Sequence, residues 1–219
     1  MSMSKLHDLV RSSDLDGCRD FLNKNPEHIN WLDEYGKSAL HIACYNNDEN
    51  MVKLLISYPD LDVNLLTKDT SEPILGFNND DSEAALHIAC IESNDKIVDL
   101  LLSVDSIDVN VISGSSEAPL HIAVCSDHNL NIVKSLVSNK NININVLDDF
   151  LNTPLHLACL EGSKKVIKFL AKCPGVDFNL KNECMETCAD CLIALSDQDI
   201  VQCVTSTKEL VTSFTSMKW

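Results

Sequence analysis

Apolar and polar positions along this chain repeat in one short pattern that occurs four times. Each copy runs through a small or hydroxyl residue, leucine, histidine, an aliphatic residue and alanine, as in Ser-Ala-Leu-His-Ile-Ala-Cys. The copies occupy residues 38–44, 84–90, 118–124 and 153–159. Their leucines are 46, 34 and 35 residues apart. A nearly fixed period of this length indicates a repeat protein, in which each repeat is one supersecondary unit stacked on its neighbours.

Each copy predicts the first of two packed helices. Small residues at Ala43 and Cys44 allow a second helix to approach closely. Val52, Leu55 and Ile56 then give that second helix an apolar stripe at three- and four-residue steps. Polar, turn-forming runs separate one helix pair from the next. The pattern therefore predicts helix-turn-helix units joined by loops.

A second marker, an asparagine after an apolar residue, keeps the same period. Asn30, Asn110 and Asn145 each lie ten residues before the next pattern leucine, whereas Asn64 lies 22 before Leu86. The long interval is therefore an ordinary repeat with an insertion of 12 residues between Asn64 and residue 84. The insertion has an apolar centre at residues 74–77, which either packs back onto the stack or presents an anchor to a partner.

The repeated phrase resembles the ankyrin repeat, whose signature is Thr-Pro-Leu-His-x-Ala followed by an Ile/Val-Val-x-x-Leu-Leu run. The later runs are residues 51–55, 97–101, 132–136 and 166–170. The resemblance covers roughly residues 4–205. It implies an all-α fold class: an ankyrin-repeat solenoid of about six helix-turn-helix units with β-hairpin or loop fingers. It also implies a non-enzymatic protein-binding module or scaffold.

We expect a single ankyrin-repeat domain over residues 1–219. Its expected parts are an N-terminal capping repeat (4–33), repeats at 34–69, 80–113, 114–148 and 149–182, an insertion at about 65–82, and a degenerate C-terminal repeat and cap (183–219).

Four positions depart from the family pattern. Ala84 and Ala118 replace the threonine that begins the first helix, so each of these helices loses a side-chain cap worth about 1 kcal/mol. Asn47 and Ser93 replace the glycine between the helices. Asparagine tolerates the left-handed conformation there, and serine is a poorer substitute.

Composition indicates a cytoplasmic or nuclear protein. The chain has 219 residues, of which 45% are hydrophobic, and contains no apolar run long enough for a membrane span or a signal segment. Several of its 10 cysteines, including Cys44, Cys90 and Cys159, fall at equivalent repeat positions. We interpret these as small buried side chains in a reducing compartment rather than as disulfide partners.

Two constellations could suggest chemistry. Histidine and cysteine lie three residues apart in the repeats, but they recur with the structural period, whereas a catalytic site is needed once. In the resembled family this histidine ties neighbouring fingers together. The second constellation is a non-repeated cluster of cysteines at Cys184, Cys188, Cys191 and Cys203. Its spacing fits no common zinc pattern, so we favour packing over a zinc- or redox-dependent function, and we expect no enzyme, metal or cofactor.

Partner-binding positions follow from the resemblance, which places them in the finger before the phrase and at the end of the first helix. The positions are Glu34, Tyr35, Lys37, Tyr45, Asn46, Asp80, Asp81, Glu83, Ile91, Glu92, Glu117, Asp149, Phe150, Asn152, Leu160 and Glu161. Lys37 is the only basic residue among them.

Charge sharpens the expected partner. The net charge is −16, and many lysines fall on the second helices, away from the expected concave face. An acidic face with apolar anchors favours a protein or peptide partner with a basic surface over an acidic face that only keeps the protein dispersed, and it disfavours nucleic acid. We also expect a monomer and no membrane partner. The length and repeat number are similar to those of gankyrin-type proteasome-assembly chaperones, whose partners are proteasomal ATPase subunits. Other ankyrin proteins inhibit kinases or transcription factors, and no residue pattern selects among these roles.

Overall fold

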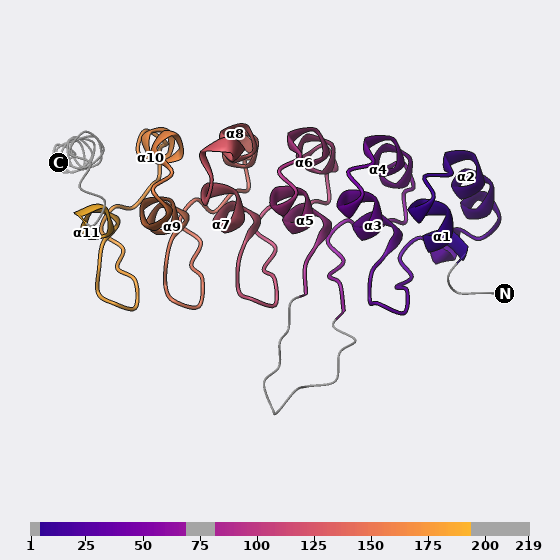
Figure 1. Ribbon diagram of the computed structural model, residues 1–219, viewed down its shortest axis with the longest axis horizontal. Helices are drawn as coiled ribbons and strands as arrows, with labels where there is room; N and C mark the ends of the chain where they lie inside the picture. Colours follow the sequence, from indigo (N-terminus) through magenta and orange to yellow (C-terminus); the bar gives the residue numbers. More distant parts are fainter. Residues whose placement is uncertain (1–4, 69–81, 194–219) are drawn as a thin grey trace, which may run out of the picture. The chain divides into compact units, whose positions relative to one another are not determined.

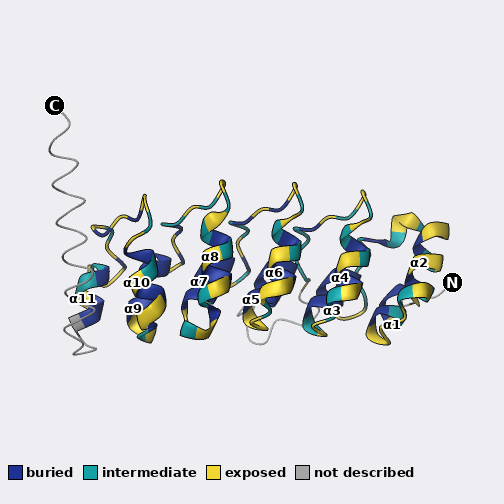
Figure 2. Ribbon diagram, turned by 90° about the horizontal axis from the view of Figure 1, so that it is seen from above, coloured by how far each residue is buried: buried dark blue, intermediate teal, exposed yellow. Residues whose placement is uncertain are grey.

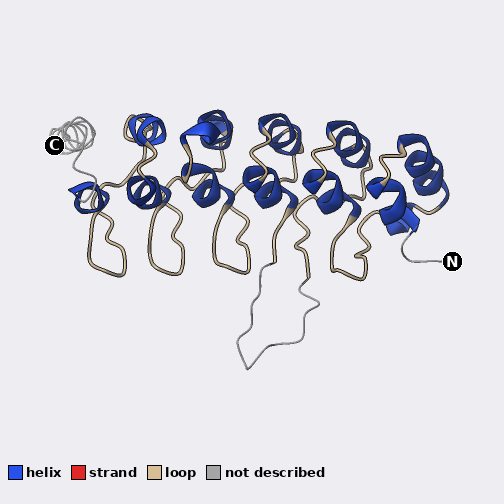
Figure 3. Ribbon diagram, viewed as in Figure 1, coloured by secondary structure: helices blue, strands red, loops and turns tan. Residues whose placement is uncertain are grey.

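The computed structural model describes residues 5–68 and 82–193 and divides the chain into two compact units, residues 1–119 and 120–219. Both units are built from short helices joined by loops (Figure 1). The described residues contain no β-strand, as Figure 3 shows, and only two isolated β-bridges, Leu32–Ser38 and Leu66–Ala84. The predicted all-α class is confirmed. The prediction of one domain over 1–219 stays a prediction.

The first unit contains three helix pairs. They are α1 (Lys5–Arg11) with α2 (Leu15–Lys24), α3 (Ala39–Tyr45) with α4 (Glu49–Ile56), and α5 (Ala85–Ile91) with α6 (Asp95–Leu102). Helices α1, α3 and α5 pack side by side in one row, and α2, α4 and α6 form the second row (Figure 1). A short 3-10 helix, η1 (Pro26–His28), follows α2. The loops that precede α3, α5 and α7 (Pro119–Val124) are called fingers, and residues 69–81 of the loop before α5 lie outside the described residues.

The second unit repeats this arrangement. It contains α7 (Pro119–Val124), a 3-10 turn η2 (Asp127–Asn129), α8 (Leu130–Ser138), α9 (Pro154–Glu161), α10 (Lys164–Leu170) and α11 (Cys188–Ile193). Helix α9 packs against both α10 and α11, and α8 packs against α10. The prediction for the last repeat beyond residue 193, including Cys203, lies outside the described residues.

The core is made by the repeated apolar positions. In Figure 2 helices α4 and α6 have buried residues on one side and exposed residues on the other. Helices α3 and α5 are buried along almost their whole length. Leu40, Leu86, Val52 and Leu55 are at most 2% exposed, and Ile56 is half-buried. Full burial of each such aliphatic side chain stabilises the folded state by about 1.5–3 kcal/mol.

The repeated cysteines belong to the same core. Cys44, Cys90 and Cys159 are completely buried, and burial raises the pKa of each thiol. A thiol that stays protonated is a poor nucleophile and a poor metal ligand. The interpretation of these cysteines as small packing residues is confirmed.

The helix starts show how the phrase begins a helix with or without a hydroxyl. The Ser38 hydroxyl accepts from the backbone N–H of His41 at 3.4 Å, and the His41 Nδ1 accepts from the backbone N–H of Ser38 at 3.0 Å. Ala84 provides no side-chain cap, but His87 Nδ1 still accepts from its backbone N–H at 3.0 Å. The predicted loss at Ala84 is confirmed, and the histidine retains half of the capping arrangement.

The turns between paired helices adopt the left-handed conformation. Asn47, Ser93 and Gly162 have φ angles of 53°, 55° and 69°. This conformation is strained for a residue with a Cβ atom, less so for asparagine. The structure therefore keeps the geometry of the family's glycine at positions where this chain has lost it.

The repeated histidines connect the first helix of a pair to the finger that follows that pair. The Nε2 atoms of His41 and His87 lie 2.8 and 2.9 Å from the backbone oxygens of Leu65 and Glu117. In the second unit, His156 Nε2 lies 3.2 Å from the oxygen of Glu186. Burial lowers the pKa of all three imidazoles, so they remain neutral at pH 7. The structural interpretation of the repeated histidine is confirmed.

The asparagine marker connects one interhelical loop to the next. Asn30 Nδ2 donates to the oxygen of Asp60 at 2.7 Å, while its Oδ1 accepts from the N–H of Asp62 at 2.8 Å. Asn64 makes the same pair of bonds to Ser106 and Asp108, each at 2.8 Å. A side chain that must both donate and accept along a neighbouring backbone explains why asparagine recurs with the repeat period.

Candidate functional site

Most of the predicted contact residues in the first unit reach the surface. Glu34, Tyr35, Asn46, Ile91 and Glu92 are exposed, with Tyr35 at 61% and Ile91 at 46%, and Lys37, Tyr45, Glu83 and Glu117 are half-buried. Asp80 and Asp81 lie outside the described residues.

The finger before α3 is fixed by Asp33 and Gly36. The Asp33 Oδ1 accepts from the backbone N–H groups of Tyr35 and Lys37 at 2.9 and 2.8 Å. Gly36 has a φ of 71°, and a Cβ atom there would lie 1.8 Å from the oxygen of Lys68. Only glycine fits this close approach, in which Lys68 N–H donates to the Gly36 oxygen at 2.8 Å. The turn thereby holds Tyr35 and Lys37 in fixed positions.

Lys37, Tyr45 and Glu83 form one connected group. The Lys37 ammonium lies 4.0 Å from the centre of the Tyr45 ring, and the Tyr45 hydroxyl donates to Glu83 Oε2 at 2.8 Å. Burial, together with Glu83, raises the pKa of Tyr45, so its hydroxyl remains a donor. The predicted apolar anchor Tyr45 is therefore already covered by a cation of the same chain.

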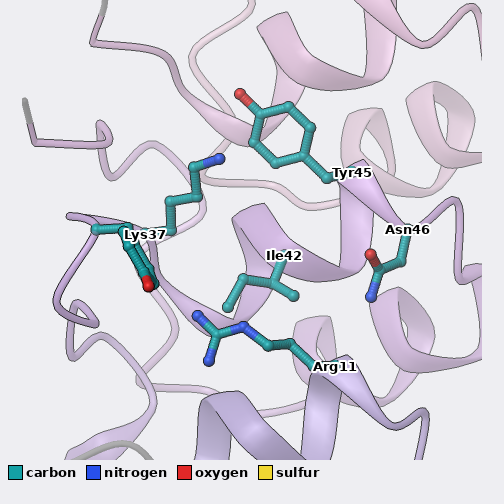
Figure 4. Close-up of a pocket in the computed structure, with 6 residues that line it drawn as sticks. Arg11, Lys37, Ile42, Tyr45 and Asn46 are labelled. Carbon is teal, nitrogen blue, oxygen red and sulfur yellow. The ribbon is translucent and has the colours of Figure 1, made fainter.

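Arg11, from the end of α1, completes a cavity beside this group. Its guanidinium pairs with Asp33 and with Asp8, the latter at 3.3 Å, and lies 6.0 Å from the Tyr35 ring centre. The cavity has a volume of about 300 Å³ (Figure 4). It is lined by Arg11, Tyr35, Lys37, Ile42, Tyr45 and Asn46.

Arg11 is a site residue that the sequence prediction missed. It lies 34 residues before Tyr45, and therefore at the same repeat position in the degenerate first copy. The repeat register places Arg11 at this contact position but does not give the direction of its side chain. Arg11 and Lys37 together place two cations beside the acidic residues Asp33 and Glu83.

In the second unit the corresponding fingers present exposed apolar side chains. Asp148 Oδ1 accepts from the N–H groups of Phe150 and Asn152 at 2.9 and 2.7 Å, as Asp33 does in the first unit. Phe150 is 64% exposed and Leu151 46% exposed. The next finger carries Met185, which is 67% exposed. Its neighbour Glu183 donates its N–H to the oxygen of Phe150 at 2.8 Å, so the two fingertips are adjacent.

Asn152, another predicted contact residue of this unit, is buried. Its side chain is 7% exposed and donates to Asp148 Oδ2 at 3.1 Å, while its oxygen accepts from Asn182 Nδ2 at 3.2 Å. It connects two adjacent fingers, and its role in partner contact stays a prediction. The other predicted residues of this unit, Asp149, Phe150, Leu160 and Glu161, are exposed.

The C-terminal cysteines do not share one environment. Cys184 is exposed, whereas Cys188 and Cys191 are buried, and burial raises the pKa of Cys191. Within residues 5–68 and 82–193, no group of three histidine, cysteine or acidic residues is arranged to hold a metal ion. None of the helices within these described residues is both long and apolar enough to span a membrane.

Repeated helix pairs, joined through periodic histidine and asparagine bridges, define a helical-repeat protein. The family model for ankyrin repeats (3 copies) matches residues 6–113, 63–148 and 106–182. The chain belongs to the ankyrin-repeat family, whose members are generally non-enzymatic protein-interaction modules. Its structure is also similar to the crystal structure of EF0377, an ankyrin repeat protein, with a TM-score of 0.79 at 20% identity. That match covers 94% of this chain and 98% of the other.

Proposed function

We propose that this protein is a non-enzymatic binding module that recognises a basic protein surface through the fingers of its second unit. The contact is centred on a fingertip patch, made of Asp149, Phe150, Leu151, Glu183 and Met185. All five side chains are exposed, two are acidic and three are apolar. The observation that carries this proposal is the exposure of Phe150 next to Leu151 and Met185 on adjacent fingertips.

The apolar part of the patch has no role in the core of its own unit. Exposed aromatic and methionine side chains are enriched in protein interfaces, and one buried aromatic anchor is worth about 2 kcal/mol or more. Leu151 also has a φ of 59°, a left-handed conformation that costs about 1 kcal/mol for a residue with a Cβ atom. A strained, exposed leucine where glycine would fit better favours a contact role over a role in stability.

The acidic part of the patch selects the partner. Asp149 and Glu183 stand beside the apolar side chains, and the chain carries a net charge of −16. Such a surface accelerates encounter with a basic protein and disfavours nucleic acid. At the rim the charges remain hydrated, so they contribute mainly to association rate and salt dependence.

The test begins with affinity capture at low and moderate salt, followed by direct binding of each purified partner. Wild type is compared with Phe150→Ser, with the charge swap Asp149→Lys/Glu183→Lys, and with two matched controls in the first unit. The controls are Ile112→Ser, at an exposed apolar position, and Asp105→Lys, at an exposed acidic one. Proteasomal ATPase subunits, the partners of gankyrin-type chaperones, are included as purified candidates.

A basic partner should bind wild type and both controls with the same affinity. Phe150→Ser should weaken its binding about 30-fold, the equivalent of about 2 kcal/mol. The charge swap should lower the association rate and remove its salt dependence. Partners that bind all variants equally at both salt concentrations would contradict the fingertip patch as the binding site.

A further inference from the structure

The cavity of the first unit has the opposite character to the fingertip patch. Two cationic side chains, Arg11 and Lys37, line it, although the chain as a whole is strongly acidic. In Figure 4 the Lys37 ammonium points toward Tyr45, and the Arg11 guanidinium lies beside Ile42, whose side chain is only 6% exposed. Tyr35 and Tyr45 supply aromatic walls, and Asn46 supplies an amide. The cavity therefore combines positive charge with apolar surface.

Arg11 and Lys37 differ in whether a carboxylate of the same chain pairs with them. Arg11 is paired with Asp33, whose side chain is 2% exposed, and with Asp8, which is 64% exposed. Within residues 5–68 and 82–193, no carboxylate lies within ion-pairing distance of the Lys37 ammonium. Lys37 instead lies over the Tyr45 ring, and its ammonium carries three N–H donors.

Glu83, the acidic residue beside Tyr45, already has a hydrogen-bond donor. Its Oε2 accepts from the Tyr45 hydroxyl at 2.8 Å, and this bond partly stabilises the negative charge of the Glu83 carboxylate. Asp33 accepts two backbone N–H groups of the finger in addition to Arg11. The acids around the cavity are thus hydrogen-bonded within the fold, whereas Lys37 has no carboxylate partner among the described residues.

We propose that this cavity receives one carboxylate side chain, an aspartate or glutamate, from the protein partner. Lys37 binds the carboxylate through a charge-assisted hydrogen bond, and the tyrosine rings cover the methylene groups. A volume of about 300 Å³ fits one side chain and is at the lower limit for a small-molecule site. This inference rests on the proposed function and specifies the partner further. The partner is a basic protein that also carries an acidic residue to fix its position.

The cavity can be tested without the partner. The full-length protein, labelled with 15N, is titrated into the millimolar range with N-acetyl-glutamate N-methylamide, and its amide signals are followed by NMR. The uncharged analogue, N-acetyl-glutamine N-methylamide, serves as the ligand control. Lys37→Met keeps an unbranched side chain beside Tyr45 but removes the charge. Lys53→Met, on the exposed face of α4, is the matched protein control.

The glutamate probe should shift the amide signals of Lys37, Tyr45 and Asn46 in a saturable manner. Lys37→Met should weaken this binding about tenfold, as expected for loss of one charge-assisted bond, and Lys53→Met should leave it unchanged. Equal shifts with the glutamine analogue, unchanged binding in Lys37→Met, or no shifts in the millimolar range would each overturn the proposal. A parallel titration with inorganic phosphate that shifts the same signals more strongly would also overturn it, because the site would then take a free anion.

The two proposals fail separately. If the glutamate probe binds through Lys37 but Phe150→Ser retains every basic partner, the fingertip patch is wrong and the cavity stands. If Phe150→Ser loses its partner but the probe does not bind, the proposed function stands and the cavity proposal is wrong.

Discussion

Helices α3 and α5 share the identical sequence Ala-Leu-His-Ile-Ala-Cys, at residues 39–44 and 85–90, and differ only in what flanks it. Both hexapeptides are buried throughout, and both histidines bond to the next finger at nearly the same distance. Ser38 precedes the first copy and Ala84 the second, whereas Tyr45 follows the first and Ile91 the second. The flanking residues therefore produce every difference between the two helices.

The difference at the helix ends shows how a repeat protein acquires a site. Lys37 and Glu83 occupy the same repeat position, three residues before the pattern leucine. Lys37 lies over Tyr45, and Glu83 accepts from the hydroxyl of that same tyrosine. At α5 the corresponding end residue, Ile91, is 46% exposed and has no hydroxyl to offer. Repeated residues build the stack, and non-repeated residues at fixed register positions build the site.

Replacing the repeated histidine of α3 or α5 should change the free energy of unfolding more than the other substitutions below. We expect His41→Leu and His87→Leu each to lower the free energy of unfolding by about 2–4 kcal/mol, because buried N–H and C=O groups lose their partners. His87→Leu should cost more, since α5 has no hydroxyl cap once the imidazole is gone. Urea unfolding followed by circular dichroism measures both.

His128→Leu is the control, because this imidazole is exposed and is not part of the repeated bridge. Losses below 1 kcal/mol in both variants, on the order of one ordinary hydrogen bond, would contradict the bridging role.

Lowering the pH should reduce the free energy of unfolding, because His41 and His87 are kept neutral in the folded protein. Burial lowers the pKa of His41 from its ordinary value of 6.5 to about 4, and it lowers the pKa of His87 as well. The unfolded chain therefore binds more protons between these values, so stability is present above pH 6.5 and is lost as pH falls toward 4. From pH 7.5 to 5, His41 alone should account for a loss of about 2 kcal/mol.

Urea unfolding at a series of pH values checks this prediction. In His41→Leu the free energy of unfolding should change less steeply with pH over this range than in wild type. The difference in slope should correspond to up to about one fewer proton taken up on unfolding. If the slopes of wild type and variant coincide, the imidazole of His41 is not kept neutral by the fold.

Exchanging the residue before each helix, Ser38 or Ala84, should change the free energy of unfolding by a smaller amount. Ser38→Ala should cost about 1 kcal/mol, and Ala84→Ser should gain up to about 1 kcal/mol. The backbone supports this exchange, since φ and ψ are −79° and 167° at Ser38 and −83° and 163° at Ala84. The double variant should then have nearly the wild-type free energy of unfolding. A destabilising Ala84→Ser would mean that the buried site at α5 has no room for the hydroxyl.

The helix pairs and the histidine bridges could be predicted because they depend on residues that recur with the period. The missing cap at Ala84 and the left-handed turns at Asn47 and Ser93 followed from the resemblance to the ankyrin repeat, which has threonine and glycine at these positions. The sequence pattern was sufficient wherever a residue's environment is the same in every repeat.

The candidate site could be predicted only in part, because repeat register fixes where a residue lies along the backbone and not where its side chain points. Asn152 occupies the register position of Lys37 and Glu83, yet it turns inward to Asp148 and Asn182. Arg11 reaches the cavity because α1 packs on α3 and Asp33 pairs with it, a contact between separate elements that no local pattern encodes.

The turns that follow α3 and α5 offer the smallest and most discriminating change. Ser93→Gly should stabilise the protein by about 0.5 kcal/mol, because relief of left-handed strain slightly exceeds the entropy that glycine adds to the unfolded chain. Asn47→Gly should be close to neutral, since asparagine tolerates this conformation and its Oδ1 accepts from Asn94 Nδ2 at 3.0 Å. Urea midpoints measured for both variants beside wild type resolve the two effects. Equal gains at both positions would show that strain, and not the side-chain bond of Asn47, sets the stability of these turns.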